Sequence, residues 1–99
     1  MISEREKLLR SAQRALLFGV TKTLRFMSLE IRDNTLFVLV YLDDEPSEED
    51  RDIYYGVAGE IEGDFSTLER NEVRIVVTKE SYDKIEHLQH LVFARAETD

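Results

Sequence analysis

The chain has 99 residues, of which 42% are hydrophobic and 34% charged, and its formal net charge is −8. This length fits one domain, and the apolar fraction is too high for a disordered acidic tail. The sequence contains no cysteine, which excludes a disulfide framework and a thiol nucleophile, and the negative charge disfavours binding to nucleic acid or anionic lipid. We therefore expect a single folded domain over residues 1–99.

The first predicted element is an amphipathic helix over residues 3–18. Ser3 and Glu6 form a capping-box pattern, in which the serine hydroxyl bonds to the first helical turn. Apolar residues then recur at helical spacing, and Gly19 is expected to end the helix. The N-terminal segment is too charged for a signal peptide, and no apolar run reaches the length of a membrane span, so we expect a cytoplasmic protein.

A β-hairpin is predicted next. Residues 24–32 alternate between apolar and polar side chains, as a half-buried strand does. Asp33 and Asn34 follow, and both residue types tolerate the left-handed backbone conformation of a tight turn. Residues 36–42 are apolar without a polar break, which indicates either a central strand covered on both faces or an edge strand that pairs with a second copy.

A second helix is predicted from Ser47, its N-terminal cap, to about Asp64. The carboxylates that follow Ser47 are favoured at the positive end of a helix. A row of apolar residues spaced four apart is expected to face the sheet: Ile53, Val57, Ile61 and Phe65.

Two further strands are predicted in the last third of the chain. Residues 72–79 alternate again, residues 80–90 are expected to form a loop or a short turn of helix, and residues 91–96 form the final strand. The element order is α-β-β-α-β-β. It predicts an α+β fold, a two-layer sandwich with two helices packed on one face of a four-stranded sheet.

The acidity of the chain is concentrated in its middle third. Residues 43–72 hold twelve carboxylates and two arginines, a net charge of −10. Such a field attracts a basic partner and speeds its encounter, although helix ends and solubility explain some of these residues. Successive 100° rotations place several of them on the outer face of the second helix. The candidate partner-binding residues are Asp43, Asp44, Glu45, Glu48, Asp52, Tyr55 and Glu62.

The outer face of this helix also carries three glycines. Gly56, Gly59 and Gly63 each weaken a helix, by about 1 kcal/mol relative to alanine in its interior. They are either a tolerated weakness or a smooth surface that lets a partner approach. Tyr55, among carboxylates, suits a partner that offers lysine or arginine, or it is an ordinary half-exposed tyrosine.

The residues that catalysis or metal binding requires are not assembled in the sequence. His87 and His90 have no further histidine or cysteine to complete a zinc site, and we expect both to be solvated. The serines lack a nucleophile-elbow motif, and the acidic run lacks the spacing of a calcium loop. We expect no enzyme activity, catalytic residue, metal or cofactor. A small hydrolase that works through the carboxylates is the alternative from another class, and it requires a carboxyl group with a raised pKa.

Three segments resemble a group of small bacterial proteins, some of them immunity proteins of contact-dependent growth inhibition systems. The segments are residues 6–17, EKLLRSAQRALL, residues 23–25, TLR, and Ser47-Glu48-Glu49-Asp50 followed by Glu60 and Asp64-Phe65. The likeness covers residues 4–65, and its motifs are helix caps and core positions.

The resemblance implies a cytosolic antidote that binds and blocks the C-terminal toxin domain of a delivered effector. Such toxins are often nucleases with basic clefts, which agrees with the charge argument. The hypothesis is therefore a non-enzymatic inhibitor whose candidate residues engage lysine and arginine of a toxin, without direct contact with nucleic acid or membrane. The rival interpretation is an acidic adaptor or nucleic-acid mimic that binds another basic protein.

Overall fold

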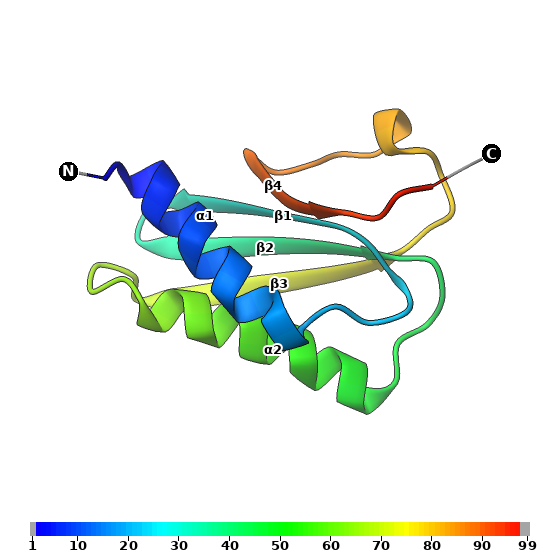
Figure 1. The fold of residues 1–99 in the computed structure, drawn as a ribbon, viewed down its shortest axis with the longest axis horizontal. Helices are drawn as coiled ribbons and strands as arrows, with labels where there is room; N and C mark the ends of the chain where they lie inside the picture. Colours follow the sequence, from blue (N-terminus) through cyan, green and yellow to red (C-terminus); the bar gives the residue numbers. More distant parts are fainter. Residues whose placement is uncertain (1, 98–99) are drawn as a thin grey trace.

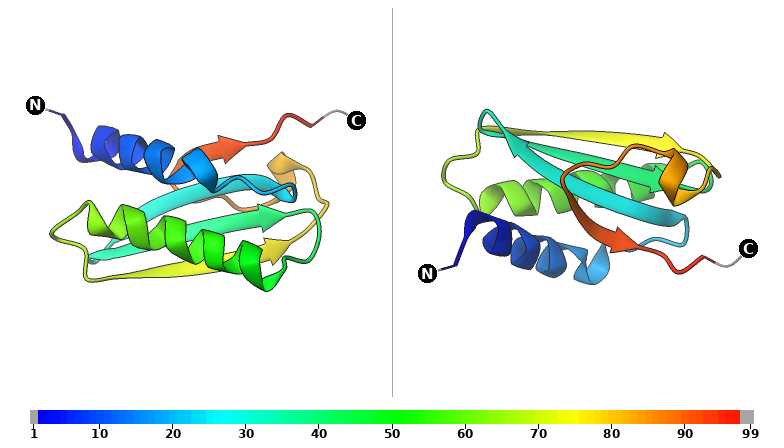
Figure 2. Two further views of the ribbon diagram at one scale, coloured as in Figure 1. Left: turned by 60° about the horizontal axis from the view of Figure 1, so that its bottom comes forward. Right: turned by 90° about the horizontal axis from the view of Figure 1, so that it is seen from above.

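The computed structural model describes residues 2–97. Its two α-helices lie on one face of a four-stranded sheet (Figures 1 and 2). This arrangement confirms the predicted α+β fold and the predicted order of elements. The elements are α1 (Glu4–Ala15), the 3-10 helix η1 (Leu16–Phe18), β1 (Leu24–Arg32), β2 (Thr35–Leu42), α2 (Glu48–Gly63), β3 (Arg70–Val77), the 3-10 helix η2 (Tyr82–Lys84) and β4 (His90–Ala94).

Both helices begin where serine was predicted to cap them. The Ser3 hydroxyl accepts the backbone N–H of Glu6 at 3.1 Å, and the Ser47 hydroxyl accepts that of Asp50 at 3.1 Å. The first helix continues beyond Ala15 as the single 3-10 turn η1 and ends at Gly19, as expected. A Cβ at Gly19 would lie 2.8 Å from Cγ2 of Val57, so the glycine allows the chain to pass close to α2.

The sheet has the strand order β3-β2-β1-β4. The strands β1 and β2 form the predicted antiparallel hairpin, and its turn residues Asp33 and Asn34 have φ angles of 49° and 60°. The strand β3 pairs parallel to β2, with α2 in the connection between them, and β4 pairs antiparallel to β1. The strand β2 is therefore central, and the alternative of an edge strand is wrong.

The main core lies between the sheet and the helices. Leu8 and Ala12 of α1 and Tyr54 and Ile61 of α2 meet the face of the sheet that carries Met27, and all five are at most 2% exposed. The predicted row of α2 is buried at Val57, Ile61 and Phe65, whereas Ile53 is only half-buried.

A second, smaller core covers the opposite face of the sheet. Phe26, Leu39 and Tyr41 are buried there, and Val76, Ile85 and Leu88 pack against them. The predicted loop or short helical turn of residues 80–90 is confirmed by η2 and its flanking loops. The Tyr41 hydroxyl donates to the carbonyl of Glu86 at 2.6 Å, and the N–H of Leu88 donates to the Ser28 hydroxyl at 2.9 Å. These bonds hold the segment against the sheet.

Candidate functional site

The exposed surface of α2 and of the loop before it is acidic. We define the acidic α2 face by its exposed carboxylates: Asp44, Glu45, Glu48, Glu49, Asp52 and Glu60. The helix itself carries six carboxylates and one arginine, a net charge of −5. None of the ion pairs formed within residues 2–97 involves a carboxylate of α2. The carboxylates of α2 are therefore not neutralised by ion pairs within the described residues.

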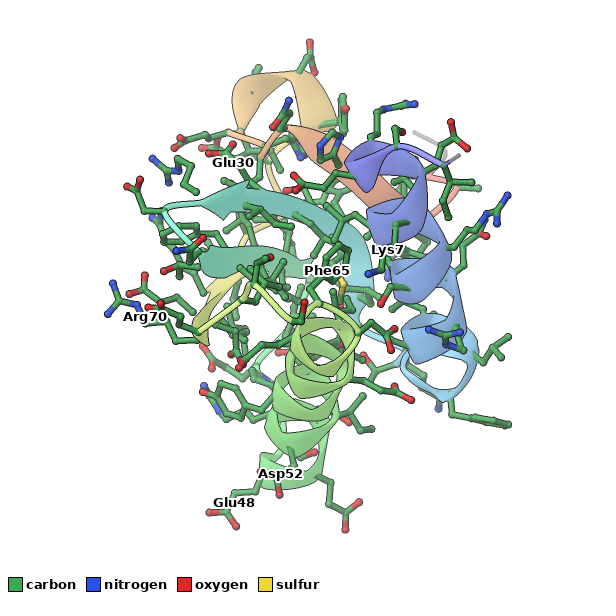
Figure 3. All side chains as sticks on the ribbon, turned by 90° about the vertical axis from the view of Figure 1, so that its left-hand side faces the viewer. Lys7, Glu30, Glu48, Asp52, Phe65 and Arg70 are labelled. Atoms are coloured by element: carbon green, nitrogen blue, oxygen red, sulfur yellow. The ribbon has the colours of Figure 1, made fainter. Side chains whose placement is uncertain are left out.

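Five of the predicted partner-binding residues lie on this surface or beside it. Asp44, Glu45, Glu48 and Asp52 are exposed, and the side chain of Tyr55 is 50% exposed. Figure 3 shows Glu48 and Asp52 together at one end of α2, pointing away from the sheet. The helix and its leading loop thus bring these five residues into one region.

The other two predicted residues bond within the molecule. Asp43 accepts from the Arg95 guanidinium at 2.8 Å, because the end of β2 lies near the chain that follows β4. Glu62, at the C-terminal end of α2, accepts from the side-chain amide of Asn71 in β3 at 2.6 Å. Both carboxylates are half-buried and already have a donor, so they are poorer acceptors for a partner than the exposed residues.

Asp43 belongs to a charge network that ties the C-terminal segment to β1. The guanidinium of Arg25, a residue only 4% exposed, donates two hydrogen bonds of 2.7 Å to Glu97 and a third of 2.8 Å to the carbonyl of Thr78. The bonds from Arg25, supported by Arg95, lower the pKa of Glu97 to about 2. Every charged group in this network has a partner, and we interpret it as a structural clamp.

A second polar cluster joins the two helices. Asp64, which caps α2, accepts from the buried Ser11 hydroxyl at 2.6 Å and from Arg14 at 2.5 Å, and these bonds lower its pKa. Lys7 lies 4.6 Å from the centroid of the Phe65 ring (Figure 3). The pKa values of Asp64 and Glu97 are both lowered, the opposite of what a catalytic acid requires.

The glycines of α2 are not required by internal packing. A Cβ at Gly56, Gly59 or Gly63 would meet no heavy atom within 4 Å. Without side chains at these three positions, the outer surface of α2 is open to a partner next to the carboxylates of the acidic α2 face.

Three exposed apolar residues follow α1 and were not among the predicted site residues. The exposed fractions are 72% for Leu17, 97% for Phe18 and 51% for Val20. The signal in the sequence is the run Leu16-Leu17-Phe18, since one face of a helix cannot bury three consecutive residues.

The histidines do not form a metal site. Among residues 2–97, no group of three or more His, Cys, Asp or Glu side chains could hold a metal ion. The expectation that both histidines are solvated is wrong for His87, because its ring stacks on Tyr82 with centroids 4.1 Å apart and contacts Phe26 and Tyr41 edge-on. In the described part of the chain, no helix is both long and apolar enough to cross a membrane.

Comparison with known proteins agrees with the resemblance noted in the sequence. The model of one protein family, described as MafI2 immunity protein, matches residues 5–97. The match extends through β3 and β4, beyond the region in which the sequence motifs were recognised. A search of curated proteins finds no match. Because the family model spans nearly the whole fold, the chain belongs to the MafI2 immunity protein family.

Proposed function

We propose that this protein is a non-enzymatic inhibitor that binds the C-terminal toxin domain of a contact-dependent growth inhibition effector through the acidic α2 face. Membership of an immunity protein family supports an immunity function and implies a toxin partner. The observation that carries the surface assignment is that exposed carboxylates of α2 lack cationic partners within residues 2–97.

The electrostatics favour a basic toxin, and a nuclease fits best. A nuclease binds phosphate groups with lysine and arginine, so its substrate cleft attracts a negatively charged helix. The helix dipole favours carboxylates such as Glu48, Glu49 and Asp50 in the first turn of α2, so these residues need no ion-pair partner within the helix. The inhibitor would cover the phosphate-binding surface or compete with the nucleic acid for it.

Charge reversal with a matched control tests this proposal. The double variant Glu48→Lys and Asp52→Lys inverts part of the acidic α2 face. The control is Glu80→Lys and Asp83→Lys, a pair of exposed residues in the segment at and before η2. Both variants raise the net charge by the same amount, so they separate a local surface effect from the effect of total charge.

The measurement is the association rate, at several salt concentrations, with a purified toxin domain that is first identified by co-expressing this chain with candidate effector domains. The α2 variant is expected to associate about tenfold or more slowly at low salt, and to lose most of its salt dependence. The control is expected to stay within about threefold of the unmodified protein. If both variants slow association equally, or neither does, the acidic α2 face is not the binding surface.

A further inference from the structure

A groove runs along the junction of the two helices. The end of α1 passes beside α2 on the same face of the sheet (Figure 2), and the groove between them has two walls. Ala15, Phe18 and Gly19 line the first wall, and Ile53, Gly56 and Glu60 of α2 line the second. We call this groove, together with the exposed Leu17 and Val20, which flank its lining residues Phe18 and Gly19 in the chain, the α1–α2 seam. The missing side chain of Gly56 keeps the groove open.

The exposed apolar residues of the seam are held on a rigid support. Leu16, immediately before them, is 8% exposed and packs in the main core. Gly19, immediately after them, is buried against Val57 and donates its N–H to the carbonyl of Leu16 at 3.1 Å. Phe18 therefore projects from a fixed turn with 97% of its surface in water. Because the backbone that carries Phe18 is already fixed, no backbone entropy is lost there when a partner covers the aromatic ring.

The charges around the seam define its partner. Glu60 lines the groove, and Glu49 and Asp52 belong to the same acidic α2 face. The arginine at the groove, Arg14, already pairs with Asp64 at 2.5 Å. Glu60 is thus the charged lining residue without an ion-pair partner within residues 2–97, and with Glu49 and Asp52 it outnumbers Arg51, the exposed cation of α2. The net negative charge favours cationic groups on whatever covers the apolar residues.

We infer that the α1–α2 seam is the docking surface for the toxin domain, with Phe18 and Leu17 entering an apolar pocket whose rim carries lysine or arginine. The cations of the rim pair with Glu49, Asp52 and Glu60. This inference rests on the proposed function and adds an apolar anchor to its acidic surface. Electrostatics disfavour a second copy of this chain as the occupant, because each copy carries a net charge of −8.

The first test truncates the anchor and compares two leucines. The probe is the same purified toxin domain, and calorimetry measures its Kd. Phe18→Ala is expected to weaken binding by about 30-fold or more, the usual effect of removing a hot-spot aromatic residue. Leu17→Ala is expected to weaken it about fivefold or more. Leu91→Ala removes a leucine that is 40% exposed on the other face of the sheet, and it should leave Kd within about twofold.

The second test fills the groove without disturbing the fold. Gly56→Leu places a side chain where no atom lies within 4 Å of the new Cβ, and it removes the helix penalty of glycine. The melting temperature is expected to rise while the affinity for the toxin domain falls about tenfold or more. A merely destabilising effect cannot produce this combination.

The outcomes separate the inference from the proposed function. If the unmodified protein does not bind the toxin domain, the proposed function fails. If it binds, and Phe18→Ala, Leu17→Ala and Gly56→Leu all bind within about twofold of it, the seam assignment is wrong and the proposed function stands. Sedimentation analysis tests whether a second copy of this chain occupies the seam instead. A dimer that dissociates when Phe18 is replaced by alanine would overturn the inference in favour of that second copy.

Discussion

Replacing Gly56 and Gly59 together by alanine is expected to stabilise the protein. Both glycines lie in the interior of α2, and a Cβ at either position would meet open space. Glycine in a helix costs free energy because its backbone is freer in the unfolded chain, and an alanine at an unobstructed position recovers that loss.

The expected gain follows from helix propensity alone. Each substitution contributes about 0.8–1.0 kcal/mol, so the pair should raise the free energy of unfolding by about 1.5–2 kcal/mol. For a domain of this size, that corresponds to an increase of about 6–16 °C in the melting temperature. Gly19→Ala is the matched control, since the same type of substitution is expected to lower the free energy of unfolding there. Its Cβ would lie 2.8 Å from the stiff, buried side chain of Val57, and such overpacking costs about 1–3 kcal/mol.

Thermal and urea unfolding, followed by circular dichroism, measure both effects, and an unchanged urea m-value ensures that the free energies are comparable. The reasoning is refuted if the Gly56→Ala and Gly59→Ala pair leaves the stability unchanged or lowers it, because then the open space above α2 is not present in solution. It is refuted equally if Gly19→Ala is neutral, because then the chain at Gly19 does not pass as close to Val57 of α2 as described.

Three further substitutions test the contacts that hold the fold together. Glu97→Gln is expected to lower the free energy of unfolding by about 1–2 kcal/mol at neutral pH, since Arg25 loses a charged partner. The pKa of Glu97 falls from an ordinary value near 4.5 to about 2 on folding, so this stabilisation is present above pH 4.5 and is lost as the pH falls toward 2. Urea unfolding across that range should show the stabilities of the variant and the unmodified protein converging at low pH. Ser28→Ala removes the acceptor of the Leu88 N–H and is expected to lower the free energy of unfolding by about 1–2 kcal/mol. Hydrogen exchange checks this, since the amide of residue 88 should exchange faster while the amides of α2 do not. Asp64→Ala leaves a buried serine hydroxyl of α1 without its acceptor and should lower the free energy of unfolding, measured in urea, by about 1–2 kcal/mol.

The acidic surface and the apolar anchor have complementary roles in the proposed complex. Unpaired carboxylates steer a basic partner and raise the association rate, while a buried aromatic anchor slows dissociation. Salt should therefore weaken binding mainly through the association rate, and Phe18→Ala mainly through the dissociation rate. This division gives kinetic measurements more power than affinities alone.

Much of the fold was predictable because its signals are local. The serine caps at Ser3 and Ser47 and the turn at Asp33 and Asn34 depend on hydrogen bonds and backbone preferences within a few residues. The periodicity of apolar residues likewise identified each helix and strand, with errors of at most a few residues at the ends, where the last turn of a helix frays or tightens. The concentration of carboxylates in the middle third can be counted in the sequence. Many of these carboxylates stay exposed in the fold because α2 presents them to solvent.

The sequence by itself therefore determined the α+β class, the order of elements and the acidic character of α2. Only the tertiary structure decided which carboxylates remain free. Asp43 meets Arg95, 52 residues away, and Glu62 meets Asn71, because strand order and helix position bring these groups together. The tertiary structure also decided that residues 82–88 pack over the second core and that Phe18 stays exposed. Periodicity shows that a residue is apolar, but burial depends on whether another element packs against it, and that is settled by contacts between distant parts of the chain.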